Sequence, residues 1–406
     1  MKTNNNIPAY RFQGYTDAWE LRKLNNIADV RDGTHNSPRY IEFGYPLVTS
    51  KNIKNGQVNF EDIQYISSFD YEEINKRSKV NINDILMGMI GTVGNLALVR
   101  EEPEFAIKNV ALIKNIGVVN IEFLYHYLGS YVIERQLQNS LDGGTQKFIS
   151  LNKIRHLDIA FPSLPEQEVI GTFFSTLDQQ ITLHQRKLDT LKEQKKTYLK
   201  LLFPAKGQTQ PALRFQGFED DWEEVKLGEI VVWEKGSGLS KSDLNIEDRG
   251  GKVIHYADLY RYKEVITEIF HSSESIEGKA IPLNSLLFPM SDVTPQGLAR
   301  ASSISIEGVR AGGDILIANI KDNSSIFLSY QVNANYRYIL PLVTGTTVRH
   351  INSTSLSTIP ISLPSLPEQE AIGTFFQTLD QEIAQVEDKL ASLKEMKKTL
   401  LRKLFV

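Results

Sequence analysis

The sequence predicts an α+β protein in which two globular domains are separated by two long repeated helices that form an antiparallel coiled coil. The two halves are expected to be related by a pseudo-two-fold axis. Two observations carry this prediction: an internal repeat with an offset of 202 to 203 residues, and a heptad pattern that closes each half. A repeat of this length is a whole domain plus a helix, because solenoid units are only about 20–45 residues long.

The repeat has two conserved parts. AYRFQGYTDAWELRKLNNI at 9–27 returns as ALRFQGFEDDWEEVKLGEI at 212–230, and FPSLPEQEVIGTFFSTLDQQI at 161–181 returns as LPSLPEQEAIGTFFQTLDQEI at 363–383. Extended to residues 203 and 405, the second pair is identical at 28 of 43 positions. Between these segments the halves look unrelated, so one frame is expected to present two different surfaces.

This pattern divides the chain into four segments. The expected segments are a first globular domain at 1–160, a central coiled-coil helix at 161–205, a second globular domain at 206–362 and a distal coiled-coil helix at 363–406. The stretch PAKGQTQP at 204–211 is typical of a linker, because its prolines and glycine cannot continue a helix.

Each helix is predicted from its start signal and its apolar period. LPEQE places a proline in the first turn and acidic residues at the positive helix end. Apolar residues then recur at alternating steps of four and three over about five heptads, which is typical of a coiled coil. The expected seam residues are Ile170, Phe174, Leu177, Ile181, Leu188 and Leu191 in the first helix and Ile372, Phe376, Leu379, Ile383, Leu390 and Leu393 in the second. Because the helices resemble each other, we expect them to pair.

Composition narrows the class of protein. The chain has no cysteine, which excludes disulfides and thiolate metal sites and fits a reducing cytoplasm. Its longest apolar stretch, 85–99, is interrupted by three glycines and an asparagine, and its N-terminus lacks the apolar core of a secretory signal. We therefore expect a cytoplasmic protein with no membrane contact. The net charge of −4 counts against nucleic-acid binding unless charge is segregated or partner subunits supply phosphate contacts.

Polar, glycine-bearing loops interrupt both variable interiors. They carry Arg, Lys, Asn, Ser and Thr, which can hydrogen-bond base edges and phosphates. Any one of these loops is more easily an ordinary surface turn, but as a set on a duplicated frame they favour recognition. The candidate DNA-binding residues are Arg31, Thr34, His35, Lys51, Asn52, Lys108 and Lys147 in the first half and Lys241, Tyr256, Asp292, Arg300 and Arg349 in the second.

Catalytic and metal-binding motifs are not found in the sequence. GSGLSKS lacks the Gly before Lys-Ser that a P-loop needs, and NIPAY lacks the aromatic residue of an amino-methyltransferase motif. The seven histidines have no metal-ligand spacing, and no Gly-x-Ser-x-Gly elbow occurs. We therefore expect no catalytic residue and no metal site in this chain.

The repeated motifs resemble those of one family, the specificity subunits of type I restriction-modification systems. RFxGFxxxW opens each half, with Tyr15 for the second Phe in the first copy, and LPxLPEQExIGTFFxTLDQxI closes each half, with Phe161 for the leading Leu. GDIL-like segments occur at 83–94 and 312–320, and DGTH at 32–35 occurs in the first half only. The resemblance covers nearly the whole chain.

The resemblance implies two target-recognition domains, each reading one half of a bipartite, asymmetric DNA site. As partners it implies double-stranded DNA, two modification (methyltransferase) subunits and two restriction/translocase subunits. It places S-adenosylmethionine, ATP and Mg2+ on those subunits and no cofactor in this chain. Two other hypotheses stay open at this point: a coiled-coil assembly scaffold whose modules bind proteins and not DNA, and a stand-alone enzyme, which the missing motifs disfavour.

Overall fold

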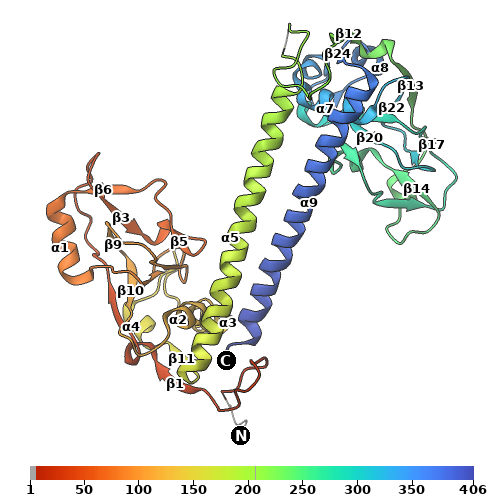
Figure 1. Cartoon of the computed structure of the whole chain (residues 1–406). Coiled ribbons are helices and arrows are strands. Elements are labelled where there is room, and N and C mark those ends of the chain that lie inside the picture. Colours follow the sequence, from red (N-terminus) through yellow and green to blue (C-terminus); the bar gives the residue numbers. More distant parts are fainter. Residues whose placement is uncertain (1–5, 206) are drawn as a thin grey trace. The chain divides into compact units, whose positions relative to one another are not determined.

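The chain folds into two compact units. Unit 1 consists of residues 1–185 with 388–406, and unit 2 of residues 186–387. The computed structural model describes residues 6–205 and 207–406. The two long helices are α5, Leu164–Leu201, and α9, Leu366–Lys403 (Figure 1). Each unit therefore contains a globular domain, the first part of one long helix and the last part of the other. The predicted α+β class with long helices is confirmed.

Unit 1 contains a four-stranded antiparallel sheet and a three-stranded sheet, and their strands are interleaved along the chain. The first has the order β2 (Asp29–Asp32), β10 (Val110–Lys114), β7 (Ile85–Gly88), β8 (Leu96–Leu98), and the second the order β6 (Gln64–Ile66), β3 (Tyr45–Thr49), β9 (Ala106–Lys108). Two-stranded pairs join β1 (Glu20–Lys23) to β11 (Asp158–Phe161) and β4 (Ile53–Lys54) to β5 (Gln57–Val58). The shorter helices are α1 (Ser68–Ser78), α2 (Ile121–Leu128), α3 (Tyr131–Ser140) and α4 (Leu151–Arg155).

Unit 2 has a five-stranded and a four-stranded sheet. Their orders are β13 (Val231–Lys235), β22 (Ile315–Ile320), β18 (Ser285–Pro289), β20 (Ser302–Ile304), β15 (Val265–Ile266), and β16 (His271–Ser273), β14 (Gly251–Ile254), β21 (Arg310–Ala311), β17 (Lys279–Ala280). Two-stranded pairs join β12 (Glu223–Lys226) to β24 (Pro360–Leu363) and β19 (Ser291–Asp292) to β23 (Arg349–His350). Its shorter helices are α6 (Pro295–Leu298), α7 (Ser325–Ala334) and α8 (Ser353–Leu356).

The two domains share the same core strand order although their interior sequences differ, and unit 2 adds β15 and β17 at the sheet edges. In both sheets a central strand, β10 or β22, pairs antiparallel with an earlier strand on each side. The parallel pair β3–β9 of unit 1 corresponds to the parallel pair β14–β21 of unit 2. The repeated frame therefore continues through the interiors, where sequence comparison found no relation.

The two GDIL-like segments do not occupy equivalent places in this topology. The segment at 83–94 forms β7, whereas the segment at 312–320 forms β22, which takes the place of β10. The counterpart of β7 is β18. An asparagine with positive φ lies just before each strand: Asn83 (68°) is two residues before β7, and Asn284 (59°) is one residue before β18. Asn tolerates this conformation. Several strands of one sheet are short, apolar and preceded by a tight turn. The GDIL-like motif therefore could not show which strands of the two domains are equivalent.

The repeated LPEQE motif is a buried anchor at the start of α5. Glu166 accepts two hydrogen bonds from the guanidinium of Arg11, each 2.7 Å long, and this paired arrangement is among the strongest in proteins. The side-chain oxygen of Gln167 accepts from the backbone N–H of Asn120 at 2.9 Å, and Asn120 in turn caps α2. The motif therefore joins the opening segment, α2 and α5 of unit 1.

The same contacts recur at the start of α9 in unit 2. Arg214 donates to Glu368 at 2.7 and 2.8 Å, and Gln369 accepts from the backbone N–H of Ser324, the N-cap of α7, at 3.0 Å. The side chains of Glu166 and Glu368 are 1% and 0% exposed. A buried carboxylate left without its partner is strongly destabilising, which explains why Arg and Glu are retained together in both copies of the repeat.

Each domain core is completed by the far end of the long helix that begins in the other half of the chain. In unit 1 the ring of Phe405 lies 5.6 Å from Phe174, 5.9 Å from Phe123 and 6.3 Å from Trp19. In unit 2 Phe203 lies 5.9 Å from Phe376 and 5.5 Å from Phe327. Phe405 and Phe203 are each 3% exposed. Burial of one such side chain contributes about 1.5–3 kcal/mol.

The expected seam residues are buried along both long helices. Eleven of the twelve are at most 8% exposed, and Ile181 is half-buried. Within unit 1, Lys397 of α9 lies 2.5 Å from Asp178 of α5, and Lys394 donates to Gln185 at 3.2 Å. Within unit 2, Lys195 lies 2.7 Å from Asp380, the counterpart of Asp178. In unit 1 the contact further along α5, at Gln185, is made by the earlier residue of α9, Lys394, so these segments run antiparallel.

His126 of α2 is a buried ionisable side chain beside this seam in unit 1. It is 2% exposed and its ring stacks on Phe174 at 5.0 Å. Burial first, and then the charges of Lys397 and Arg100, lower its pKa from 6.5 to about 3. Asp178 lies 3.9 Å from Nε2, but Lys397 already balances that carboxylate, so Asp178 does not hold a proton on the imidazole.

The neutral His126 should make unit 1 acid-sensitive. The unfolded chain protonates this residue near pH 6.5, whereas the folded chain does so only near pH 3, so stability falls as pH drops between these values and is unaffected above them. In the wild type this residue should lower the free energy of unfolding by about 2 kcal/mol between pH 8 and pH 5, and His126→Phe should remove that loss. Urea unfolding at both pH values measures this difference, with the exposed His156→Gln as control. An unchanged pH dependence in His126→Phe would contradict it.

Candidate nucleic-acid interface

The DGTH segment of unit 1 is a turn that leaves the end of β2 and crosses close to β9. A β-carbon on Gly33 would lie 2.2 Å from the carbonyl oxygen of Ile107, so only glycine fits. The backbone N–H of Gly33 donates to Val110 and that of Thr34 donates to Ile107, each at 3.0 Å. These bonds hold the residues that follow β2 against the end of the neighbouring strand.

Asp32 fixes the side chains around this turn. Its carboxylate is 7% exposed, accepts from Arg77 of α1 and lies 2.7 Å from Nε2 of His35. The other ring nitrogen of His35 lies 2.8 Å from the side-chain oxygen of Asn109. The His35 side chain is 59% exposed, so a rigidly held imidazole faces solvent.

Arg31 and Lys108 flank this cluster. Lys108 pairs with Thr34 in an isolated β-bridge, and its ammonium group donates to Ser37 at 2.5 Å. Arg31 donates to Asp29 at 2.8 Å, and this hydrogen bond and the carboxylate charge raise its pKa against the effect of burial. Arg31, Thr34, His35 and Lys108 are therefore neighbours in the folded domain, although 72 residues of chain lie between His35 and Lys108.

Ser50 links this cluster to two further loops. Its hydroxyl donates to the carbonyl oxygen of Asn109 at 2.8 Å and accepts from the backbone N–H of Met89 at 3.0 Å. Two residues beyond Met89, Gly91 donates its N–H to the carbonyl oxygen of Lys147 at 2.9 Å. The predicted residues joined along this edge of unit 1 are Arg31, Thr34, His35, Lys51, Lys108 and Lys147.

Lys51 and Asn52 are adjacent in the chain but differ in role. Lys51 is exposed and its ammonium group donates to the carbonyl oxygen of Asp62. Asn52 is 2% exposed, accepts from the backbone and hydroxyl of Thr49 and donates to the carbonyl oxygen of Asn59. We therefore assign Asn52 to the turn and not to a ligand-binding surface.

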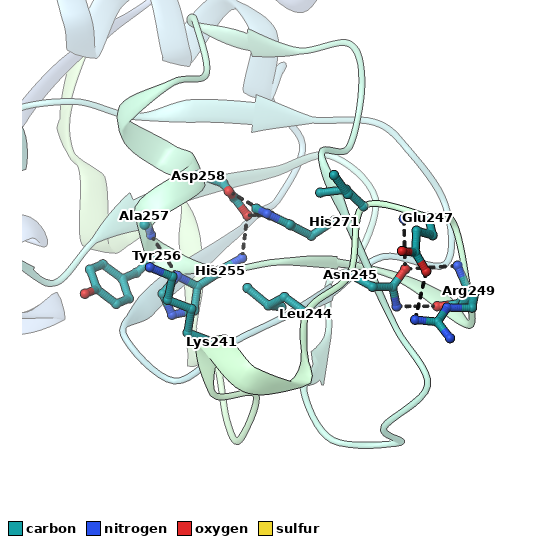
Figure 2. A pocket seen from close by; sticks show the side chains of 11 residues that line it. Lys241, Leu244, Asn245, Glu247, Arg249, His255, Tyr256, Ala257, Asp258 and His271 are labelled. Atoms are coloured by element: carbon teal, nitrogen blue, oxygen red, sulfur yellow. Dashed lines mark hydrogen bonds and ion pairs between the residues drawn. The ribbon is translucent and has the colours of Figure 1, made fainter.

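Unit 2 has a surface pocket of about 550 Å3 at the position that corresponds to the turn of Lys51. Figure 2 shows its lining side chains, which include Lys241, Arg249, His255, Tyr256, Asp258 and His271. Lys241 belongs to the 3-10 turn Lys241–Asp243 and Tyr256 to the 3-10 turn Tyr256–Tyr260, so two predicted residues meet in this pocket.

Burial and a backbone hydrogen bond define the surroundings of His255. Its Nδ1 accepts from the backbone N–H of Ala257 at 3.3 Å, as the dashed line in Figure 2 marks. Burial lowers its pKa, Asp258 opposes this effect and His271 and Lys241 add to it. In the neutral ring the proton therefore sits on Nε2, which is left to donate a hydrogen bond. Asp258 meanwhile binds His271 at 3.0 Å.

The other predicted residues of unit 2 lie on segments that contact the same 3-10 turn. Tyr260 donates its hydroxyl to the carbonyl oxygen of Ser291, which connects the turn to the β19–β23 pair. Asp292 and Arg349 stand opposite each other in that pair. Arg300 donates to the carbonyl oxygens of Tyr260 and Tyr262 at 3.0 and 2.6 Å, and burial lowers its pKa. Arg300 therefore braces the turn from inside the domain.

Sequence reasoning missed several residues that shape these surfaces. In unit 1 they are Asp32, Arg77 and Asn109, and in unit 2 His255, Asp258 and His271. Asp32 lies in the DGTH segment at 32–35, Asn109 is next to the candidate Lys108, and His255 and Asp258 lie within two residues of the candidate Tyr256, so the sequence pointed to these places. Arg77 and His271 come from other elements, and only folding brings them to these loops.

Two classes of site are not found in the part of the chain that the structure describes. Among residues 6–205 and 207–406, no group of three or more histidine and acidic side chains is arranged to hold a metal ion. Within the same residues, every helix is too short or too polar to cross a bilayer.

Comparison with known proteins identifies the family of the repeated domain. The family model for the type I restriction modification DNA specificity domain matches residues 16–193 and, a second time, residues 219–395. The chain belongs to this family. The two matches coincide with the two copies of the internal repeat, so each half is one specificity domain. The predicted type I specificity subunit is thereby confirmed.

Similar proteins include two named specificity subunits. The putative type I restriction enzyme MjaX specificity subunit of Methanocaldococcus jannaschii is 24% identical over 417 residues, which cover 94% of this chain and 92% of that protein. The type I restriction enzyme EcoBI specificity subunit of Escherichia coli is 29% identical over 163 residues, 37% of this chain and 33% of that protein. The first similarity spans both halves of the chain.

Solved structures share the fold. The crystal structure of the type I restriction-modification S subunit from M. genitalium has a TM-score of 0.66 at 16% identity, covering 98% of this chain and 99% of that one. A chain from a study of complex assembly and conformational transition of the type I restriction-modification system has a TM-score of 0.51 at 18% identity, covering 94% and 96%.

The close approach at Gly33 gives a prediction for unit 1. Gly33→Ala is expected to destabilise the domain by about 1–3 kcal/mol, because the new methyl group would overlap a backbone carbonyl that cannot move alone. Gly144→Ala is the matched control, since a β-carbon there meets nothing within 4 Å. Hydrogen exchange of the β2 and β9 amides measures the difference, and equal protection in both variants would contradict the close-packing argument.

Proposed function

We propose that this chain is the DNA-reading, non-catalytic subunit of a type I restriction-modification complex, with each unit reading one part of a bipartite, asymmetric site. The observation that carries the proposal is one topology present twice with different exposed hydrogen-bonding groups. Unit 1 exposes His35 held by Asp32, whereas unit 2 exposes the pocket of His255 and Tyr256. Different donors and acceptors read different bases, so the two half-sites should differ.

The charges at the candidate surface support a nucleic-acid ligand despite the negative net charge. Asp32 is balanced by Arg77, and Asp142 by Lys153 at 2.6 Å. By contrast, the ammonium groups of Lys51, Lys108 and Lys147 donate to neutral oxygens. Positive charge at this edge is therefore left for phosphate groups, which supply most of the salt-dependent affinity for DNA.

We further propose that α5 and α9 form an antiparallel coiled coil that sets the distance between the two DNA segments. The buried seam and the ion pairs beside it within each unit support this proposal. Each helix has 38 residues and is about 57 Å long, which exceeds the roughly 34–36 Å of one turn of B-DNA. In this scheme 1–160 and 206–362 are the reading domains, and 161–205 and 363–406 are the spacing helices.

The remaining chemistry is assigned to partner subunits. We expect two modification subunits carrying S-adenosylmethionine and two restriction/translocase subunits using ATP and Mg2+, all in the cytoplasm. Flipping and methylating an adenine in each half-site would be the task of the modification subunits. The assembly-scaffold alternative, with modules that bind proteins, predicts no sequence-dependent band shift by the complex reconstituted with its modification subunits.

Exchange of one variable module should change one half-site. Replacing residues 28–160 with the corresponding segment of another family member is expected to alter the methylated bases in one half of the target and leave the other half intact. Mapping methylated adenines by single-molecule sequencing of the host genome measures both halves. The reciprocal exchange of residues 231–360 is the matched control and should alter the other half. Unchanged methylation after both exchanges would refute the proposal.

Helix length should set the unread spacer. Inserting one heptad into α5 between Ile181 and Leu191, together with one into α9 between Ile383 and Leu393, lengthens both helices by about 10 Å and keeps their pairing. The expected result is a spacer longer by about three base pairs, whereas the α5 insertion alone should abolish or alter methylation because it shifts the pairing. Seven residues inserted after Gly207, outside both helices, are the control. Wild-type spacing in the paired insertion would contradict the proposal.

A further inference from the structure

One exposed loop is repeated in the variable interiors, where little else of the sequence is. Residues 143–147 read Gly-Gly-Thr-Gln-Lys and residues 345–349 read Gly-Thr-Thr-Val-Arg, at an offset of 202 residues. Both follow the pattern Gly-x-Thr-x-basic, and both precede a buried isoleucine and the N-cap of a short helix, α4 or α8. We call these segments the tip loops.

The tip loops have the same backbone. Gly143 and Gly345 have φ of 88° and 96°, and a β-carbon there would lie 2.4 and 2.3 Å from the carbonyl oxygen three residues later. A two-way backbone bridge closes each loop, between Asp142 and Phe148 at 2.9 and 3.0 Å and between Thr344 and His350 at 3.0 and 2.8 Å. Each loop is thus a tight hairpin that requires glycine at its first position.

The basic side chain takes the same course in both loops. The ammonium group of Lys147 donates to the carbonyl oxygen of Gly143, and the guanidinium of Arg349 donates to that of Gly345. Both loops are anchored in the same way, because Ile149 donates its N–H to the carbonyl oxygen of Met89 and Ile351 to that of Met290. The two loops therefore occupy equivalent places in the two domains.

Packing explains only part of what the loops share. Ile149 and Ile351 are 1% and 3% exposed, so their identity follows from the cores they enter. Thr145, Thr347 and Lys147 are exposed, and Arg349 is half-buried. Each basic side chain closes its own loop by a hydrogen bond, but that bond leaves a positive charge and further N–H donors at the loop, beside a threonine, which points to a ligand outside the domain.

The charges around the loops leave Lys147 available in unit 1, whereas a carboxylate, Asp292, stands opposite Arg349 in unit 2. In unit 1 Lys153 binds Asp142 at the base of the loop at 2.6 Å, and in unit 2 a neutral residue, Thr344, stands in its place. Lys147 has two further N–H donors beyond the one on Gly143. In Arg349 the Nε donor is buried, so only the terminal guanidinium nitrogens, one of which donates to Gly345, can meet a phosphate.

The residues beside the loops differ between the units. In unit 1 Gly91 lies opposite Lys147, whereas in unit 2 Asp292 lies opposite Arg349. The next residue along the loop is Phe148 in unit 1 and His350 in unit 2. Two half-sites of different sequence have only their sugar-phosphate backbone in common. The cation and the hydroxyl that both domains retain are therefore suited to bind the phosphate backbone, which the two half-sites share. The residues that differ are suited to contact the bases.

We propose that the two tip loops grip the DNA phosphodiester backbone in the same way in each half-site, with Lys147 and Arg349 as positioning residues that read no base. This inference rests on the proposed DNA-reading function. It assigns Lys147 and Arg349, two of the candidate DNA-binding residues, to phosphates. Base reading is left to the surfaces around His35 and His255.

The test uses the full chain in complex with its modification subunits. The probes are a fluorescent duplex carrying a methylated site mapped in the host genome and a duplex with that site scrambled. Lys147→Gln and Arg349→Gln are each expected to weaken binding to both duplexes about 8-fold at 0.1 M salt and to reduce the slope of log affinity against log salt by about 0.9. The methylated sequence should stay the same.

Controls separate a phosphate contact from other effects. Lys147→Arg and Arg349→Lys should keep most of the affinity, because a phosphate needs the charge more than the shape. Lys196→Gln on α5, whose ammonium group lies 3.2 Å from Glu193, removes the same charge elsewhere and should change nothing. Unfolding temperatures near that of the wild type establish that the Lys147, Arg349 and Lys196 variants fold.

The contradicting results are distinct. Unchanged affinity and salt slope in both Gln variants would overturn the inference, and a changed base in one methylated half-site would overturn it by making that residue a base reader. If the wild-type complex does not distinguish the site duplex from the scrambled one, the proposed function itself fails and this inference fails with it.

Discussion

The core of each domain is incomplete without the end of the long helix that starts in the other half of the chain. Phe405, two residues after α9, fills the core of unit 1, and Phe203, two residues after α5, fills that of unit 2. Because this exchange is reciprocal, a domain cut at the apparent sequence boundary would expose an apolar gap. The frame therefore depends on two helices that each begin in one core and end in the other.

The polar contacts of the frame serve the same arrangement. The buried pairs Arg11–Glu166 and Arg214–Glu368 fix the first turn of each long helix to its own domain, and Gln167 and Gln369 attach a second helix to it. Further along, Asp178 and Asp380 each meet a lysine from the end of the opposite helix. A buried charge is tolerated only with its partner in place, so Glu166 and Glu368 fix each helix start to its own domain. The pairs of Asp178 and Asp380 are partly exposed and contribute less.

On this frame the side chains of the exposed turns are free to differ. The strands, the parallel pair and the tip loops are shared, whereas the side chains on the turns after β2 and β14 are not. Unit 1 holds an imidazole on a buried aspartate, and unit 2 has a pocket lined by His255, whose Nδ1 accepts a backbone hydrogen bond. A constant frame with variable turns is what a protein needs to recognise two different sequences on one polymer.

The sequence by itself determined the repeat, the two long helices, the seam residues and the α+β class, because these rest on local signals: a proline start, an acidic first turn and a heptad period. It also marked most of the polar turns that the fold brings to one edge. Only the tertiary structure decided which turns correspond. The counterpart of β7 is β18 and not the GDIL-like β22, Asn52 and Arg300 are turned into the domain, and Arg77 and His271 reach sites far away in the chain. Strand order and side-chain pairing depend on contacts between distant segments, which a period or a motif in one segment does not encode.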